Sequence, residues 1–311
     1  MAILGRVVSG LLVCLSSILL LTGYAKNENN PINSEVNTVK NSQTEIVHSK
    51  IIGDYKIAIY HPDTAIPPQG WPVIYLLDGD SFFTDVVDFV QRQSMPIIVV
   101  AIDYPEQTRR MRDYLPNPPE LIPEVLSNGK ANVLEAYGGA DDFGGFLQTE
   151  LKPRVEQRFA IDPNRQIIFG HSIGGIFVLH TLFTQPNAFS DYIASSPSIW
   201  FNDRYILQEA QNFLADSKSI NLAHPAHLYL SVGALEQSLT GKEVFPSETA
   251  KQLRAQHLQN RRMVDNVRDL ATLLSNSSTD ALSVETKIYP QQIHQTVGIL
   301  VLEERLSQLL Q

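Results

Sequence analysis

The feature that most constrains this chain is a glycine-flanked serine that joins an apolar run to a helical segment. The stretch reads Gly170-His171-Ser172-Ile173-Gly174, with Gly175 next. It follows the apolar run 166–169 and precedes the apolar segment 176–183. Small residues on both sides of the serine allow a sharp strand-to-helix turn that holds the Ser172 hydroxyl exposed and strained. The alternative is an ordinary strand-to-helix turn whose glycines serve only packing.

Apolar runs alternate with helical patterns along most of the chain. The runs 71–77, 96–102, 166–169, 192–194 and 227–232 are typical of buried strands, and 283–289 alternates apolar and polar residues as the last strand. The segments 81–93, 140–159, 205–213, 247–274 and the one after 294 are compatible with helices. The runs 45–52 and 55–60 alternate apolar and polar residues, which predicts an antiparallel hairpin. The whole pattern predicts one α/β domain, with a doubly wound, mostly parallel sheet flanked by helices. Ligands of such sheets bind at the carboxyl ends of the strands.

Residues 1–25 differ in kind from the rest of the chain. Arg6 is their only charged side chain, 7–22 is almost wholly apolar, and Gly23 and Ala25 are small residues at the two positions that a signal peptidase reads. We therefore expect a signal peptide at 1–25, a flexible polar leader at 26–44 and the domain at 45–311. A retained membrane anchor is the alternative, because the apolar run is only slightly short for a span.

Composition restricts the expected compartment and partners. The single cysteine, Cys14, lies in the expected signal, so a cleaved product has neither a disulfide nor a thiol nucleophile. Export without disulfides fits a bacterial periplasm. Loss of Arg6 would change the net charge from −9 to −10, and an acidic chain without a basic run is not expected to bind nucleic acid. No cluster of histidine, cysteine and aspartate has metal-ligand spacing, so no metal or organic cofactor is expected, and no obligate protein partner is evident.

A nucleophilic serine needs a base, normally an imidazole that a carboxylate orients. Among the histidines beyond the serine's own helix, His224 and His227 lie at the start of a strand, the wrong edge of the sheet, and His257 lies inside a long helix. His294 follows the last strand and enters the final helix, where the base is expected. The alternative is that His294 only caps that helix.

Two further histidines lie close to the serine in sequence. The side chain of His171 must point away from Ser172 or pack beneath the turn, and His180 lies two helical turns further on. Neither is expected to be the base.

The orienting carboxylate is expected on the loop after the strand 227–232. Glu236 lies four residues beyond that strand, at the correct edge of the sheet, whereas Glu243 and Glu248 lie farther into the connection. A serine–histidine pair oriented by another hydrogen-bond acceptor is the alternative.

Two backbone amides are expected to stabilise the oxyanion of an ester-cleaving serine. One is that of Ile173, directly after the serine. The other should come from the turn after the strand 71–77, where Asp80 is the first candidate and Gly79 the next. The Asp80 carboxylate would have to turn outward, because a negative charge beside an oxyanion is unfavourable.

The segment 104–138 is long for a loop in a compact domain, and it contains five prolines. It also carries Arg109, Arg110 and Arg112, which are suited to anionic groups. The alternative is that these arginines pair with nearby carboxylates, namely Asp103, Glu106 and Asp113.

An ordered set of motifs resembles the putative-esterase branch of the α/β-hydrolases. The motifs are Leu76-Leu77-Asp78-Gly79-Asp80, the segments 110–116 and 138–143, the Gly170–Gly175 turn with Ile176-Phe177, Ser195-Ser196-Pro197-Ser198-Ile199-Trp200, Gly233-Ala234-Leu235-Glu236 and His294. The resemblance covers nearly everything from about residue 45 to the end. That branch includes esterase D, feruloyl esterases and siderophore hydrolases, and the resemblance is closest to the last group, whose exported members cleave the trilactone of catecholate siderophores.

The resemblance implies a serine carboxylesterase that acts on a small-molecule ester, with Ser172 and His294 in the leading roles. It also implies Arg110 as a residue that grips a negatively charged substrate. Tyr104 and Trp200 could supply flat surfaces for an aromatic acyl or catechol group, or could be rim packing. Gln295 stands where many relatives have a glycine, which affects local geometry more than the role of His294.

The same motifs also serve other activities. Esterases of short acyl groups, feruloyl esterases and acyltransferases use the same machinery. A catalytically idle hydrolase fold that binds a ligand is a further alternative, and the presence of both Ser172 and His294 argues against it.

Overall fold

The computed structural model describes residues 40–126, 128–134, 136–216, 226–275 and 282–310. The expected signal peptide and nearly all of the expected leader lie outside these ranges. The strand β1 already begins at Ser42, so the last residues assigned to the leader belong to the sheet instead. They pair with β2, for example Ser42 opposite Tyr60.

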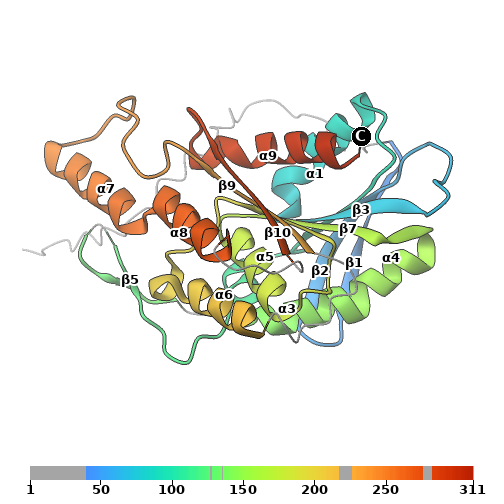
Figure 1. The fold of residues 1–311 in the computed structure, drawn as a ribbon, viewed down its shortest axis with the longest axis horizontal. Coiled ribbons are helices and arrows are strands. Elements are labelled where there is room, and N and C mark those ends of the chain that lie inside the picture. Colours follow the sequence, from blue (N-terminus) through green and yellow to red (C-terminus); the bar gives the residue numbers. More distant parts are fainter. Residues whose placement is uncertain (1–39, 127, 135, 217–225, 276–281, 311) are drawn as a thin grey trace, which may run out of the picture. The chain divides into compact units, whose positions relative to one another are not determined.

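The fold is organised around a sheet of eight strands (Figure 1). The strands are β1 (Ser42–Ser49), β2 (Gly53–Tyr60), β3 (Trp71–Leu77), β4 (Ile98–Asp103), β7 (Ile161–His171), β8 (Asp191–Ser195), β9 (Ala226–Gly233) and β10 (Leu282–Tyr289), in the spatial order β1-β2-β4-β3-β7-β8-β9-β10. β2 runs antiparallel to β1 and β4, and every pair from β4 to β10 is parallel. This arrangement confirms the predicted doubly wound, mostly parallel α/β sheet.

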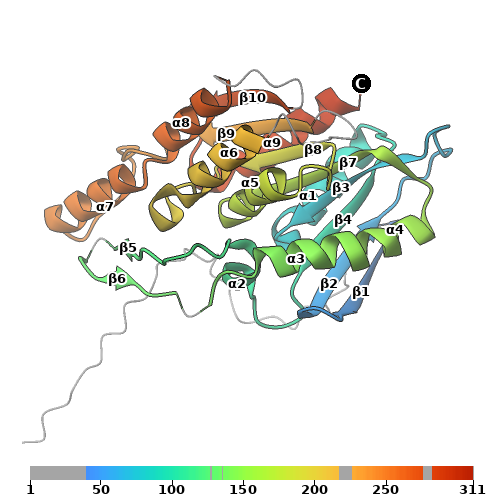
Figure 2. The ribbon, with the colours of Figure 1, turned by 60° about the horizontal axis from the view of Figure 1, so that its bottom comes forward.

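Helices cover both faces of the sheet (Figures 1 and 2). They are α1 (Gly79–Arg92), α2 (Arg110–Tyr114), α3 (Ala140–Phe146), α4 (Lys152–Arg158), α5 (Ile173–Thr184), α6 (Tyr205–Asp216), α7 (Glu248–Arg261), α8 (Met263–Ser275) and α9 (His294–Leu309). α1 and α9 pack on one face, and α3 to α6 and α8 lie on the other. No helix within the described ranges is long and apolar enough to cross a membrane.

The sheet forms two apolar cores because its central strands are buried on both faces. Every residue of β3 is buried. Alternate side chains enter opposite layers: Val73 and Tyr75 join the core beneath α5, whereas Ile74 and Leu76 join the core beneath α1 and α9. This burial explains why β3 is a continuous apolar run rather than an alternating one.

Two helices predicted as continuous are interrupted. The predicted helix 247–274 is wrong: it breaks at Arg262, which has a left-handed backbone (φ 47°) between α7 and α8. Buried side chains occur along α8 but not along α7, which contacts the domain through partly exposed side chains such as Arg261 on Trp200. The predicted helix 140–159 contains a π-helical turn at Leu147–Leu151, just before Pro153, which has no amide to donate.

The long segment 104–138 contains regular structure. It includes α2 and a small ribbon of β5 (Glu124–Val125) and β6 (Ala131–Asn132). This ribbon lies at the same end of the domain as α7, as both views show (Figures 1 and 2).

The buried histidine of α5 joins three helices. His180 Nδ1 lies 2.9 Å from the Glu209 carboxylate of α6, and its Nε2 lies 3.2 Å from Asp141 of α3. Burial alone would lower the pKa of His180, but hydrogen bonds to the two carboxylates outweigh it and raise the pKa to about 9. A ring protonated on both nitrogens satisfies both partners.

This cluster predicts a stability change with pH. The folded-state pKa of about 9 exceeds the ordinary 6.5, so the stabilisation is complete below pH 6.5 and is lost as the pH rises through 9. The shift corresponds to about 3 kcal/mol. We expect the difference in unfolding free energy between wild type and His180→Gln to shrink by about that amount between pH 6 and 10, measured by urea denaturation. An equal difference at both pH values would contradict the ion pair.

Candidate active site

The serine turn has the backbone of a strained strand-to-helix junction. Ser172 directly follows β7 and precedes α5, with φ 59° and ψ −116°. A non-glycine residue adopts this conformation only where its surroundings enforce it. The Ser172 amide donates to the carbonyl of Ser195 (3.0 Å), and the Ser198 amide donates to the carbonyl of Ser172 (3.0 Å). These two bonds tie the turn to the end of the neighbouring strand β8.

Close backbone approach explains the first glycine of the motif. A Cβ atom at Gly170 would lie 2.1 Å from the carbonyl oxygen of Gly174, which no side chain tolerates. The first turn of α5 therefore rests directly on the end of β7, and this contact positions Ser172.

The structure brings His294 and Glu236 together. His294 is the first residue of α9, and Glu236 follows β9 in the adjacent loop. Nδ1 of His294 lies 2.6 Å from Oε2 of Glu236. With the Nδ1 proton donated to the carboxylate, Nε2 of the neutral ring keeps its lone pair and can accept a proton.

The Glu236 carboxylate is buried but fully hydrogen-bonded. Its side chain is 1% exposed. Its second oxygen, Oε1, accepts from the Gly233 amide at 2.7 Å and from the Ser196 hydroxyl at 2.5 Å. A buried carboxylate needs such donors to offset its desolvation. The loop therefore fixes Glu236 in the orientation that faces His294.

Gly233 allows the acid and the base to meet. A Cβ atom there would lie 2.5 Å from the carbonyl oxygen of Gln292 and 2.9 Å from Oε1 of Glu236. The Leu235 amide also donates to the Gln292 carbonyl at 3.0 Å. The end of β9 thus lies directly against the segment that leads to His294.

His294 lies beside the serine turn. Its ring centroid is 4.5 Å from that of His171, the residue that precedes Ser172. Within the described residues, the Ser172 hydroxyl has its hydrogen-bond contact with Ser198 Oγ, at 3.4 Å, and not with His294. Nucleophile–base bonds are often loose in the absence of substrate and tighten in the complex.

The candidate oxyanion donors lie at the start of two helices. Ile173 is the first residue of α5 and Gly79 is the first of α1, and the first amides of a helix lack intrahelical partners. The prediction for Asp80 does not hold in this structure, because its amide donates to the Asp103 carboxylate at 2.7 Å. Its carboxylate pairs with Lys56. Gly79, the second candidate, remains available.

The three arginines of the segment 104–138 all pair with carboxylates. Arg112 bonds Asp113 at 2.8 Å and Arg109 lies 3.7 Å from it, as the alternative interpretation expected. Arg110 instead makes a bidentate pair with Asp78, at 2.9 and 2.8 Å. Asp78 follows β3, and a Cβ atom at Gly174 would lie 3.4 Å from its carboxylate. Arg110 thus lies near the serine turn, with its charge neutralised.

The two aromatic candidates differ in accessibility. Tyr104 is 5% exposed and packs between Tyr55 and Tyr114, so the structure contradicts the interpretation of a substrate-facing ring. Trp200 is only partly buried, and the Arg261 guanidinium lies 4.2 Å from its ring centroid. Trp200 therefore remains a candidate substrate contact.

The sequence analysis included the loop 195–200 among its motifs but assigned no role to its serines, which hold the site together. Ser195, Ser196 and Ser198 contact His171, Glu236 and Ser172 respectively, in addition to the backbone bonds of the serine turn. The run of small polar residues directly after a buried strand was the available signal. Their individual partners depend on tertiary structure and could not be assigned.

His171 lies in the site but does not add a second base. Its Nδ1 is 3.2 Å from the Ser195 hydroxyl, and Phe82 lies at its edge. Burial, with the nearby His294 and Arg110, lowers the pKa of His171 to about 3. The ring is therefore neutral throughout the range in which esterases are assayed.

This shift predicts the shape of the pH–rate profile. Ester hydrolysis should decline towards low pH because the base must be neutral to accept a proton. His171 is already neutral there, so it should add no second ionisation, and the limiting slope of a plot of log(kcat/KM) against pH should not exceed one on the acid side. A limiting slope approaching two would contradict the neutral state of His171.

Comparisons with known proteins show which family the chain belongs to. The model of the family described as "Putative esterase" matches residues 49–269. The chain is 35% identical over 237 residues to the siderophore enterobactin esterase of Emericella nidulans, covering 72% of this chain and 77% of that protein. It is 40% identical over 196 residues to the ferri-bacillibactin esterase BesA of Bacillus subtilis, covering 59% of this chain and 66% of BesA, just under two thirds of its length.

Solved structures show the same fold. The siderophore hydrolase EstA from Aspergillus nidulans superposes with a TM-score of 0.75 at 30% identity, covering 93% of this chain and 98% of EstA. The BES protein from Bacillus cereus superposes with a TM-score of 0.70 at 30% identity, covering 86% and 95% of the two chains. The family match extends over most of the chain, and these relatives confirm it. This chain therefore belongs to the putative-esterase family of the α/β-hydrolase fold.

Proposed function

We propose that this protein is an exported serine esterase that hydrolyses carboxylic esters, with the trilactone of a catecholate siderophore as its substrate. The observation that carries the esterase proposal is the 2.6 Å bond between His294 and a buried, fully bonded Glu236, beside a strained serine. The siderophore relatives support the substrate class.

The proposed reaction proceeds through an acyl-enzyme. Ser172 Oγ attacks the ester carbonyl while its proton passes to Nε2 of His294. The amides of Ile173 and Gly79 donate to the oxyanion. The tetrahedral intermediate collapses, the carbon–oxygen bond of the ester breaks, and His294 returns the proton to the leaving alcohol.

Water completes the turnover. His294 removes a proton from a water molecule that attacks the acyl-enzyme, and then protonates Ser172 as the carboxylic acid leaves. Glu236 keeps the imidazole in the required tautomer and stabilises its protonated form. Each step uses only groups of this chain together with ester and water.

The test compares two kinds of ester. The purified protein is assayed with p-nitrophenyl esters of rising chain length and with iron-free and ferric enterobactin, and products are identified by liquid chromatography and mass spectrometry. We expect the trilactone to be opened with kcat/KM at least about tenfold above that of the best p-nitrophenyl ester, because remote binding energy contributes to catalysis. Hydrolysis of p-nitrophenyl esters alone would remove the siderophore substrate, and no hydrolysis of either would contradict the esterase.

Export is a separate part of the proposal. The apolar run 7–22 and the small residues Gly23 and Ala25 support cleavage after Ala25. Expression of the full chain in a Gram-negative bacterium, fractionation and N-terminal sequencing should find a periplasmic protein that begins at Lys26. An intact N-terminus in the membrane fraction would favour the anchor instead.

A further inference from the structure

His171 precedes the nucleophile in the chain, but its side chain contacts the base. The ring centroids of His171 and His294 lie 4.5 Å apart, with the ring planes inclined at 40°. His171 is the last residue of β7 and His294 is the first of α9, so the contact joins two elements at the edge of the sheet where Ser172 lies. The mechanism proposed above gives His171 no part.

Glu236 fixes one atom of the base but not the plane of its ring. The 2.6 Å bond holds Nδ1 of His294, and the imidazole can still turn about that bond. Proton transfer requires Nε2, on the other side of the ring, to come within hydrogen-bond reach of the Ser172 hydroxyl. Catalytic groups must be held to within about 0.5 Å and 10–20° of the productive geometry. A second contact on the ring is therefore needed, and His171 supplies one.

The His171 ring is itself held from two sides. Its Nδ1 lies 3.2 Å from the hydroxyl of Ser195, a fully buried residue at the end of β8. Phe82 of α1 packs at its edge, with centroids 6.2 Å apart and an interplanar angle of 70°. Phe82 in turn packs on Phe169 of β7, at 5.0 Å. His171 is thus fixed between the sheet and α1, and it can serve as a rigid support.

The helix that carries the base rests on the same two rings. Gly298 lies one turn beyond His294 on α9, and residues four apart share a helix face. A Cβ atom at Gly298 would lie 3.0 Å from Cε1 of Phe82 and 3.5 Å from Cγ of His171. The glycine therefore lets the first turns of α9 approach both rings closely. His171 thus lies against both the helix and the imidazole of the base.

The charge of His171 is compatible with this contact. His294 becomes positively charged when it accepts the serine proton, and a second cation beside it would oppose that step. Burial, with the nearby charges of His294 and Arg110, lowers the pKa of His171 to about 3. The ring is therefore neutral at the pH of the reaction and can lie beside an imidazolium without repulsion.

We propose that His171 is a positioning residue for the base: its ring fixes the plane of the His294 imidazole so that Nε2 is directed at Ser172. Glu236 holds Nδ1 and His171 holds the face of the ring, which together leave one orientation. The inference rests on the proposed function, because it concerns the base of that reaction. It requires an aromatic ring at position 171 and not the ability of that ring to accept a proton.

Two substitutions separate the ring from its nitrogens. His171→Ala removes the support, whereas His171→Phe keeps an aromatic ring that cannot accept a proton. In steady-state kinetics with p-nitrophenyl butyrate, we expect His171→Ala to lower kcat about 30-fold with KM within about twofold, because a misplaced reacting group costs up to about 10²-fold. His171→Phe should keep at least about a third of kcat. An unchanged kcat in His171→Ala, or an equal loss in both variants, would overturn the role of the ring.

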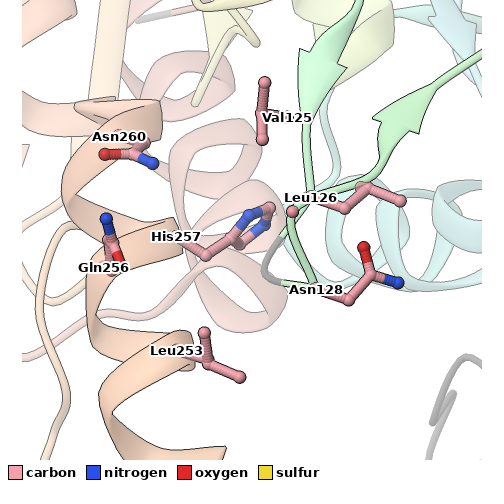
Figure 3. A pocket seen from close by; sticks show the side chains of 8 residues that line it. Val125, Leu126, Asn128, Leu253, Gln256, His257 and Asn260 are labelled. Carbon is pink, nitrogen blue, oxygen red and sulfur yellow. The ribbon is translucent and has the colours of Figure 1, made fainter.

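His257→Ala is the matched control. His257 is also a partly buried histidine, with 11% of its side chain exposed, but it projects from α7 towards Leu126 (Figure 3). The residues that line the cavity of about 360 Å³ beside it include none of the catalytic candidates. We expect kcat and KM of His257→Ala within about twofold of wild type. Thermal unfolding curves of the three variants show which losses come from the fold.

A double variant tests whether His171 acts through His294. The rate at which a fluorophosphonate labels Ser172 is measured for His171→Ala, for His294→Ala and for both together. We expect His171→Ala to slow labelling about tenfold or more when His294 is present, and less than about twofold when it is absent. An equal slowing in both backgrounds would show that His171 supports the serine turn instead. That result would overturn the positioning role and leave Ser172 as the nucleophile.

A readout without catalysis keeps the inference separate from the proposed function. Carbon-13 relaxation of the Cε1–H bond of His294 gives an NMR order parameter for the motion of its ring. We expect a rigid ring in wild type and in His257→Ala, and an order parameter below about 0.6 in His171→Ala. An equal order parameter in wild type and His171→Ala would overturn the positioning role. This result can be read even if wild type hydrolyses no ester and the proposed function fails.

Discussion

Ser172→Ala is expected to lower kcat/KM for ester hydrolysis by at least about 10⁴-fold, the largest effect of any single substitution in this protein. The hydroxyl is the atom that bonds to the acyl group, and the strained turn at φ 59° presents it at the helix start where Ile173 offers its amide. Removing one oxygen atom from a half-buried side chain should leave the fold intact. Steady-state kinetics with p-nitrophenyl butyrate, together with a thermal unfolding curve, measures both expectations.

Ser198→Ala is the matched control. Its hydroxyl lies only 3.4 Å from that of Ser172, but Ser198 is not at the strand-to-helix turn. We expect a loss of at most about tenfold, because Ser198 contacts the nucleophile without reacting. Comparable losses of kcat/KM in both variants would contradict the assignment of Ser172 as the nucleophile.

Glu236→Gln is expected to lower kcat by about 10³-fold or more, with a small change in KM. The carboxylate accepts from His294 Nδ1, from the Ser196 hydroxyl and from the Gly233 amide. A carboxamide has only one oxygen, so it cannot accept from both sides, and it either favours the wrong imidazole tautomer or turns its NH₂ group towards a donor. Kinetics over a series of p-nitrophenyl esters gives the two parameters separately.

Glu243→Gln supplies the comparison for this second prediction. Glu243 lies farther along the same connection, where it accepts from the amide and hydroxyl of Thr240. Its substitution should leave kcat within about twofold of wild type, as for a surface position. If Glu236→Gln kept more than a tenth of wild-type activity, the protein would function as a serine–histidine pair.

The chain order and the strand pattern were enough to place the main candidates. The sequence places Ser172, Glu236 and His294 each after a strand, and the carboxyl ends of parallel strands meet at one edge of the sheet. That rule brings residues 58 positions apart into the 2.6 Å contact between Glu236 and His294. Periodicity likewise predicted β3 and the parallel sheet, because buried strands produce long apolar runs.

The sequence-based predictions that the structure contradicts concern groups that have several possible hydrogen-bonding or packing partners nearby. The Asp80 amide bonds Asp103 and Arg110 bonds Asp78, and sequence spacing does not distinguish these pairs from others within the same loops. Tyr104 is interpreted from the sequence as a flat surface for an aromatic group or as rim packing, yet it is buried among other aromatic rings. Such choices depend on tertiary packing rather than on local pattern.

The most direct test of the central claim is labelling with a fluorophosphonate, followed by peptide mass spectrometry. The reagent phosphonylates a serine that an adjacent base activates. We expect one adduct, on the peptide that contains Ser172, with none in Ser172→Ala and much slower formation in His294→Ala. An unlabelled wild-type protein, or equal labelling of wild type and Ser172→Ala, would contradict it.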